Sequence, residues 1–188
     1  MDDGLLTAAR RAIEDHGWEG ATLERIARAA GVSRMTLHRH GVSRDALLAA
    51  LAARLEAEHR EAMFGPLTAR GSGRERLEAA LAALCRTAEA NRGLLAALSA
   101  QEHAAVYHEG GDGPGAVGTR PAFTEAIERL LLDGAADGSL RATDAAETAT
   151  VLVNLVGLSY RHLRDGHRWS AERARDGVLA IALEGVAA

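Results

Sequence analysis

The strongest chemical signal in this sequence is a cluster of basic side chains between residues 22 and 44. The segment holds five arginines and one carboxylate, Glu24, so its formal charge is +4, whereas the whole chain carries −4. A basic patch on an otherwise acidic protein is typical of a surface that contacts a polyanion. From composition alone, the alternative is a solvated, arginine-rich helix face. The secondary structure expected around the cluster distinguishes a polyanion-binding surface from a solvated helix face.

Capping residues and hydrophobic spacing predict two short helices across this segment. Thr22 caps the first helix and Gly31 ends it, while Ser33 caps the second and Gly41 ends it after two turns. Leu37 faces the interior, which leaves the basic side chains of the second helix pointing outward. A helix, a tight glycine-containing turn and a second helix with a basic outer face make a helix-turn-helix.

The rest of the chain is also predicted to be helical, which gives an all-α fold of about nine helices. Alanine and leucine are abundant, whereas aromatic residues make up 3% of the chain and prolines number three. The expected helices cover about residues 5–16, 22–30, 33–40, 43–63, 72–88, 91–108, 121–133, 144–164 and 170 onward, with a flexible loop at 109–118. Further predicted caps are Ser43, Ser72 with Glu75, Thr143 and Ser170.

Pro66 and the glycines near it predict a domain boundary. Residues 1–48 are expected to form the helix-turn-helix domain, the helix over 43–63 connects it, and residues 64–188 form a helical bundle. The predicted helix over 144–164 is apolar nearly all round from Val151 to Leu158, and the helix after Ser170 has a broad apolar surface. Such helices must be covered on more than one side, which indicates a homodimer through these last two helices.

The N-terminal region contains a specific pattern: Thr22, Ile26 and Ala27, followed by AGVS, TL, HRH and SRDALL. With this pattern, residues 5–51 resemble the operator-binding domain of TetR-family transcriptional repressors. The resemblance implies an N-terminal three-helix domain that binds DNA, with a variable helical bundle behind it. Two positions depart from the family pattern: His38 stands where tyrosine is usual, and Gly41 stands where phenylalanine is usual. Gly41 removes an aromatic anchor, and Trp18 is a candidate to fill the gap.

An α-helix fits the major groove of DNA, and its N-terminal residues reach base edges first. Arg34, Met35, His38 and Arg39 are therefore expected nearest the bases. The resemblance implies that Thr22, Thr36, His40 and Arg44 lie against the phosphate backbone. The predicted DNA-binding residues are Thr22, Ser33, Arg34, Met35, Thr36, His38, Arg39, His40 and Arg44.

By analogy with the family, a homodimer places two such helices on a palindromic operator, and a small-molecule effector between the fifth and eighth helices releases it. Two alternatives stay open: a dimer that binds DNA without any ligand, and a helical ligand-binding protein that has lost DNA contact. The effector pocket is predicted to include Leu84, Leu98, His103, Tyr107, Phe123, Asn154 and Tyr160.

Other candidate sites have simpler explanations. His103 and His108 are five residues apart, about 140° around a helix, so they do not share a face as metal ligands would. Cys85 continues an inward stripe and is expected to be a buried hydrophobic residue rather than a redox thiol. Asn154 either specifies dimer register or meets a ligand. Enzymatic, metal and cofactor motifs are lacking, so neither enzyme activity nor a cofactor is expected.

The chain is expected to work in the cytoplasm. It has a single cysteine and lacks the pattern of a signal peptide. Its longest apolar region, TATVLVNLVGLSY, is interrupted by polar residues and is shorter than the ~18 to 20 apolar residues that a membrane span requires.

Overall fold

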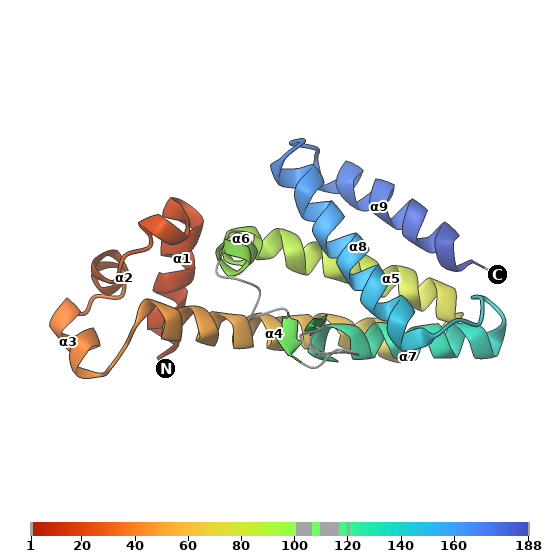
Figure 1. The fold of residues 1–188 in the computed structure, drawn as a ribbon, viewed down its shortest axis with the longest axis horizontal. Coiled ribbons are helices and arrows are strands. Elements are labelled where there is room, and N and C mark those ends of the chain that lie inside the picture. Colours follow the sequence, from red (N-terminus) through yellow and green to blue (C-terminus); the bar gives the residue numbers. More distant parts are fainter. Residues whose placement is uncertain (1, 101–106, 110–116, 120, 188) are drawn as a thin grey trace. The chain divides into compact units, whose positions relative to one another are not determined.

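The computed structural model describes residues 2–100, 107–109, 117–119 and 121–187 (Figure 1). These residues form nine α-helices and one small two-stranded sheet, so the predicted all-α fold is confirmed. The helices are α1 (Asp3–Gly20), α2 (Leu23–Ala29), α3 (Arg34–Arg39), α4 (Arg44–Thr68), α5 (Gly73–Ala90), α6 (Arg92–Ala100), α7 (Pro121–Asp137), α8 (Ala145–Asp165) and α9 (Ala171–Val186). The paired strands are β1 (Tyr107–Glu109) and β2 (Val117–Thr119).

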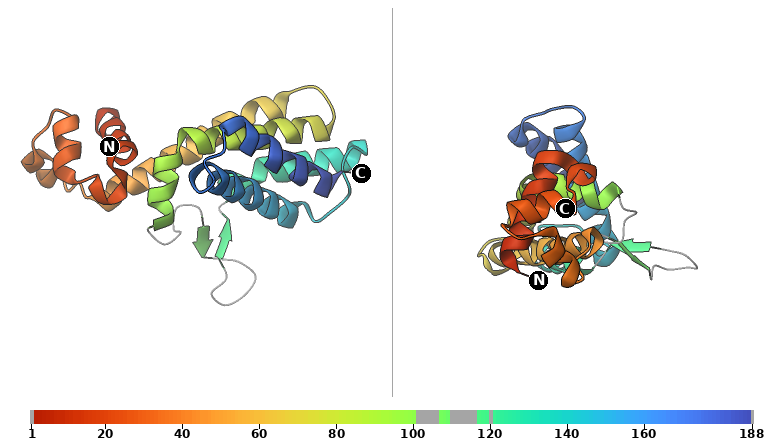
Figure 2. Two further views of the ribbon diagram at one scale, coloured as in Figure 1. Left: turned by 90° about the horizontal axis from the view of Figure 1, so that it is seen from above. Right: turned by 90° about the vertical axis from the view of Figure 1, so that its left-hand side faces the viewer.

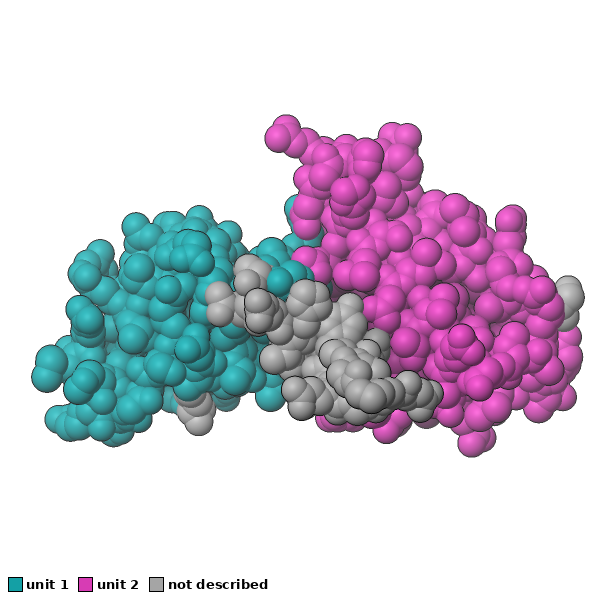
Figure 3. All heavy atoms as spheres, viewed as in Figure 1, with its two compact units in different colours: residues 1–55, 91–117 teal, residues 56–90, 118–188 magenta. Residues whose placement is uncertain are grey.

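The chain divides into two compact units, which Figure 3 shows in different colours. Unit 1 contains residues 1–55 and 91–117, and unit 2 contains residues 56–90 and 118–188. The two units are defined by packing alone. The division of roles expected from the sequence, with DNA binding in 1–48 and effector binding and dimerisation in 64–188, stays a prediction.

Unit 1 is built around α1. This helix packs against α2 and α6, and α2 packs against α3. Its core consists of aliphatic side chains from several helices, among them Ile13, Ile26 and Leu47. The backbone of α6 comes close to α1, because a Cβ atom added to Gly93 would lie 3.3 Å from the Cα of Glu14.

Unit 2 is a helical bundle in which α7 and α8, α5 and α7, α5 and α8, and α8 and α9 pack together. Figures 1 and 2 show α8 and α9 running side by side in opposite directions. The N-terminus of α5 meets the end of α7 at two glycines, where a Cβ atom on Gly73 would lie 2.2 Å from the Cα of Gly134. Only glycine at position 73 permits this approach.

A polar cluster joins α5 to α8 within unit 2. The guanidinium of Arg164 donates to both carboxylate oxygens of Glu89, at 2.9 and 2.6 Å, and the hydroxyl of Tyr160 donates to Glu89 at 2.9 Å. Burial, and then the hydrogen bond with Glu89, raise the pKa of Tyr160 to about 12. The phenol therefore stays protonated and remains a donor throughout the neutral range.

Most predicted caps are confirmed. Ser33, Ser43 and Ser170 accept hydrogen bonds from the amide three residues later, as Thr22 does. Ser72 and Glu75 form the predicted reciprocal capping box, with bonds of 2.9 and 3.3 Å. The cap predicted at Thr143 is wrong, because the amide of Glu147 donates to Asp144 instead. An adjacent carboxylate competes successfully for this position.

The helices α4 and α7 run further than predicted, and α6 is shorter. The predicted end of α4 near Met63 is wrong, because the helix continues through Pro66 to Thr68. The last turn is stabilised by Arg76, which donates to the carbonyls of Pro66 and Leu67 at 3.2 and 2.8 Å, groups that the helix end leaves open. Similarly, α7 continues to Asp137 rather than Asp133.

The predicted helix over 91–108 is also wrong at its end. The described helix stops at Ala100, and residues 107–109 form a strand. His103 and most of the predicted loop at 109–118 lie outside the described residues.

His59 is a buried polar residue that the sequence did not reveal. It lies on α4 with 1% of its surface exposed, its ring is 5.1 Å from that of Phe123, and its two ring nitrogens have no hydrogen-bond partner in the described part of the chain. Burial lowers the pKa of His59 to about 4; the backbone of Phe123 opposes this shift, and the nearby Arg60 charge adds to it slightly. The folded protein therefore holds this imidazole neutral.

The low pKa of His59 predicts acid sensitivity of unit 2. As the pH falls from about 6.5 to 4, His59 becomes protonated in the unfolded chain but stays neutral in the folded one. The free energy of unfolding therefore decreases by up to about 3 kcal/mol. Urea denaturation of wild type and His59→Leu at pH 7.5 and 4.5 measures this. We expect the leucine variant to lose less stability on acidification, whereas His167→Gln, on an exposed histidine, should behave as wild type. Equal pH dependence of wild type and His59→Leu would contradict the assignment.

Candidate nucleic-acid interface

The tetrapeptide Gly–Val–Ser–Arg occurs twice, at residues 31–34 and 41–44, and both copies fold the same way. Gly31 and Gly41 adopt left-handed backbone angles, with φ of 69° and 65°. In each copy the amide of the valine bonds the carbonyl five residues earlier and the amide of the glycine bonds the carbonyl three residues earlier, at 3.0 to 3.2 Å. This is the Schellman motif that ends a helix.

The serine of each copy begins the next helix. The side chain of Ser33 accepts from the amide of Thr36, and that of Ser43 accepts from the amide of Ala46, both at 3.0 Å. One repeat therefore ends α2 and starts α3, and the other ends α3 and starts α4. The six residues of α3 are held at both ends by hydrogen bonds of the adjoining turns.

Replacing Gly41 by alanine tests the second turn. The left-handed backbone disfavours any Cβ, although the space around it is open, since nothing lies within 4 Å. We expect Gly41→Ala to lower the free energy of unfolding by about 1 kcal/mol. Gly65→Ala is the matched control, because it lies in a helix with equally open space and should be neutral or slightly stabilising. Chemical denaturation measures both; equal stabilities would show that strain at residue 41 is negligible.

The side chains of α3 divide into an inner and an outer set, as predicted. Leu37 is 4% exposed and anchors the helix in unit 1. Arg34, His38 and Arg39 are exposed, and Met35 is 72% exposed. A large apolar side chain in water, on the same short helix as two exposed arginines, is suited to an apolar contact such as the methyl group of thymine.

The five arginines of the basic segment have different environments. Arg28 pairs with Glu24 at 2.9 Å, Arg25 donates to the carbonyl of Gly20 at 2.7 Å, and Arg44 donates to the carbonyl of Trp18. Arg34 and Arg39, both on α3, have no ion-pair or hydrogen-bond partner within the described residues. The structure thus leaves the two arginines predicted to read bases unengaged.

The residues expected at phosphates have mixed surroundings. The hydroxyls of Ser33 and Thr36 lie 2.9 Å apart, Thr22 caps α2, and His40 is exposed at the end of α3. Arg44, also expected at a phosphate, instead has its guanidinium 4.3 Å above the ring of Trp18. No local pattern predicts that contact, because the two residues are 26 positions apart.

That Trp18 fills the gap left by the missing aromatic side chain at residue 41 stays a prediction. A hollow of about 490 Å³ lies beside the second turn in unit 1, and Trp18 is not among its lining residues. The hollow is lined by Asp2, Leu5, Ala30, Val32, Leu37, His40 and Val42.

A comparison with protein families identifies this helix-turn-helix. Residues 5–51 match the family described as bacterial regulatory proteins, tetR family. The N-terminal segment is a TetR-family DNA-binding domain. The match covers α1 to α3 and the start of α4, and it supports a role in DNA-binding transcription regulation. No curated protein sequence matches the chain significantly.

Solved structures share the TetR fold over nearly the whole chain. A TetR-family regulator named PfmR from Thermus thermophilus has a TM-score of 0.71 at 18% identity, covering 97% of this chain and 98% of its own. A putative tetR family transcription regulator from a Shewanella species has a TM-score of 0.64 at 22% identity, with 98% and 97% covered. The protein AibR, in complex with isovaleryl coenzyme A and operator DNA, has a TM-score of 0.65 at 21% identity, with 94% and 95% covered.

The residues predicted to line an effector pocket are divided between the two units. Leu84, Phe123 and Tyr160 are buried in unit 2, while Leu98 is buried in unit 1. Asn154 is partly buried and its amide donates to the carbonyl of Thr150 on the same helix at 2.8 Å. His103 lies outside the described residues, and for Tyr107 the structure describes only the backbone, in β1. The predicted pocket therefore stays a prediction.

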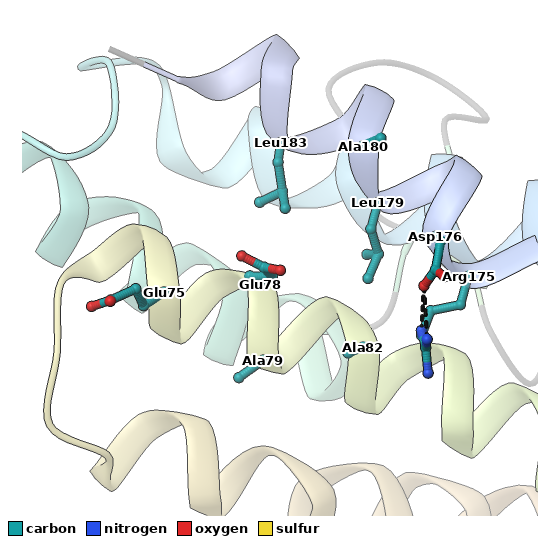
Figure 4. A pocket seen from close by; sticks show the side chains of 9 residues that line it. All are labelled: Glu75, Glu78, Ala79, Ala82, Arg175, Asp176, Leu179, Ala180 and Leu183. Carbon is teal, nitrogen blue, oxygen red and sulfur yellow. Dashed lines mark hydrogen bonds and ion pairs between the residues drawn. The ribbon is translucent and has the colours of Figure 1, made fainter. Parts of the chain in front are cut away.

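The described residues of unit 2 line at least two open hollows on its surface. One, of about 610 Å³, lies between α5 and α9, where Leu179 and Leu183 point toward α5 and Glu78 faces α9 (Figure 4). The other, of about 560 Å³, lies on α8 and α9 and is mostly apolar, with Leu155, Leu158 and Ile181 among its lining residues. None of the predicted effector-pocket residues lines either hollow.

Three further expectations concern chemistry outside DNA binding. Cys85 is buried, as predicted, and burial raises the pKa of its thiol to about 11. Within the described ranges, no three histidine, cysteine or acidic side chains gather closely enough to hold a metal ion. A search of the same residues finds no helix with the length and apolar content needed to cross a membrane.

Proposed function

We propose that this TetR-family regulator is a homodimeric repressor that binds a palindromic operator through α3 and is released by a small-molecule effector. The observation that carries the proposal is the outer face of α3, where Arg34 and Arg39 are unengaged and Met35 is exposed. Arginine pairs with guanine and methionine contacts thymine methyl groups in the major groove. Ser33, Thr36, His38, His40 and Thr22 complete the proposed DNA surface, whereas Arg44 is considered separately below.

A dimer is supported by the apolar surface of the last two helices. Val151, Leu155 and Leu158 repeat at helical spacing on α8 and are 55%, 40% and 52% exposed, and Ile181 on α9 is 70% exposed. Four large apolar side chains in water are characteristic of an interface. The proposed twofold dimer would set two α3 helices about one DNA turn apart, ~34 to 36 Å, on an inverted repeat.

Two charge substitutions test the dimer. Leu158→Glu and Ile181→Glu each place two carboxylates, one per subunit, in the proposed interface, so we expect monomers at micromolar concentration and weaker operator binding. Sedimentation or size-exclusion chromatography with light scattering measures the mass. Leu132→Glu is the control, since Leu132 is 52% exposed on α7 and should leave the mass unchanged. A wild-type monomer, or intact dimers of both variants, would exclude this interface.

The effector role is proposed for unit 2. It is supported by analogy with AibR, whose solved complex holds isovaleryl coenzyme A together with operator DNA, and by the mainly apolar interior of unit 2. A coupling of ~1 to 3 kcal/mol between effector and operator suffices for release. Of the effector contacts predicted from the sequence, those that belong to unit 2, and are therefore proposed here, are Leu84, Phe123, Asn154 and Tyr160.

DNA binding near the chain's own gene tests the function as a whole. We expect purified protein to bind an inverted repeat in that DNA, with an affinity that falls steeply as salt rises. Absence of salt-dependent binding to this DNA would refute the proposed repressor.

A further inference from the structure

The end of α1 forms a turn that presents two backbone carbonyls to its neighbours. The helix is interrupted at Gly17, whose φ of 67° and ψ of 175° are open to glycine and strained for other residues. The amide of Ala21 closes the turn by bonding the carbonyls of Gly17 and Trp18 at 3.0 and 3.2 Å. This turn also places the ring of Trp18 toward the start of α4, where Arg44 lies over it.

Two arginines from different helices bind this turn. Arg25, on α2, donates to the carbonyl of Gly20 at 2.7 Å, and Arg44, the first residue of α4, donates to the carbonyl of Trp18. The guanidinium of Arg44 also lies 4.3 Å from the centre of the Trp18 ring, which is cation–π geometry. Its Nε atom is buried and has no partner among the described residues. The Arg44 side chain is thus directed into the protein.

The position of Arg44 connects this contact to α3. Arg44 follows the turn Gly41–Ser43, which ends α3, so whatever holds Arg44 also limits where the C-terminal end of α3 lies. Arg34 occupies the equivalent place in the first Gly–Val–Ser–Arg repeat, but it is exposed and has no described partner. The same tetrapeptide therefore places one arginine on the outer face and the other in a half-buried contact with the end of α1.

We propose that Arg44 is a positioning residue for operator binding: its contact with Trp18 fixes α3 and α4 on α1, and it does not neutralise a DNA phosphate. This inference rests on the proposed operator binding. It replaces the phosphate contact expected for Arg44 from the sequence.

The test measures affinity for the chain's operator DNA over a range of salt concentrations, for wild type, Arg44→Lys, Arg44→Gln and Trp18→Leu. Lysine keeps the charge that a phosphate needs but loses the planar group that stacks on tryptophan. Trp18→Leu keeps every charge. At one salt concentration, we expect Arg44→Lys and Trp18→Leu each to bind at least tenfold more weakly than wild type. A variant that carries both substitutions should bind only slightly more weakly than either single variant.

A phosphate contact gives a different pattern. Arg44→Lys would then stay within twofold of wild type, and Arg44→Gln would reduce the slope of log affinity against log salt by about one per subunit. That result would overturn the proposal, as would unchanged affinity of Trp18→Leu. The control is Arg11→Gln, which removes an exposed charge on α1 and should leave affinity nearly unchanged.

Folding and function are checked separately. Circular dichroism must show folded variants; if Trp18→Leu is unfolded, Trp18→Phe, which retains a ring, takes its place and should bind with intermediate affinity. Trp18 fluorescence in a Trp169→Phe background should shift in Arg44→Gln, because the cation leaves the ring. Wild type that fails to bind DNA would refute the repressor itself, whereas wild-type binding with a phosphate-like pattern would refute only the role of Arg44.

Discussion

Gly73→Ala is expected to destabilise unit 2 by about 3 kcal/mol or more. The added Cβ would lie 2.2 Å from the Cα and 2.3 Å from the nitrogen of Gly134, and backbone atoms cannot move aside as a flexible side chain can. To relieve the clash, α5 must separate from α7. That movement would break the bonds from the amide of Gly73 to Asp137 at 2.6 Å and from Arg76 to Asp133 at 3.0 Å.

Urea denaturation of the purified variants measures this loss. Gly185→Ala is the matched control, because it lies in α9 of the same unit with nothing within 4 Å of its added Cβ, and it should be as stable as wild type or slightly more. A Gly73→Ala variant within 1 kcal/mol of wild type would mean that the two helices can separate at little cost.

Arg34→Ala and Arg39→Ala are expected to weaken operator binding severely and to reduce discrimination between operator and unrelated DNA. A bidentate contact between arginine and guanine is worth ~1 to 3 kcal/mol, and the proposed dimer makes each contact twice, so each substitution should cost about 30-fold or more. Both side chains are exposed and unengaged, so the stability of unit 1 should not change.

Fluorescence anisotropy with the chain's promoter DNA and with a scrambled duplex measures affinity and selectivity. Arg28→Ala is the control, because Arg28 is already paired with Glu24 on α2. An equal loss on both duplexes would assign these arginines to phosphates rather than to bases. Unchanged binding would show that α3 does not contact DNA.

Much of the DNA-binding unit could be predicted from the sequence because local signals specify it. The hydrogen bonds of a helix cap join residues three positions apart, and those of the glycine turns join residues up to five positions apart. The capping role of Ser33 and Ser43 and the helix ends at Gly31 and Gly41 could therefore be predicted from neighbouring residues. The outward face of α3 followed from its spacing around the buried Leu37.

The features that escaped prediction depend on residues far apart in the chain. Three contacts are examples: Arg44 with Trp18, Gly73 with Gly134, and the ring of His59 with that of Phe123. No periodic pattern in the sequence predicts any of them. The end of α4 was misjudged for the same reason, since distant Arg76 satisfies the carbonyls that Pro66 and Leu67 leave open. The effector contacts also depend on tertiary packing, and they remain a hypothesis.

The attachment of α3 has a consequence for how such a regulator can change its target. The two ends of α3 are held by backbone amides, two glycines and two serine hydroxyls. Its inner face is held by the buried side chain of Leu37. The side chains that face outward contribute almost nothing to this attachment. Mutations at residues 34, 35, 38 and 39 can therefore accumulate without unfolding the domain, so a new promoter preference can evolve, or be engineered, on an unchanged scaffold.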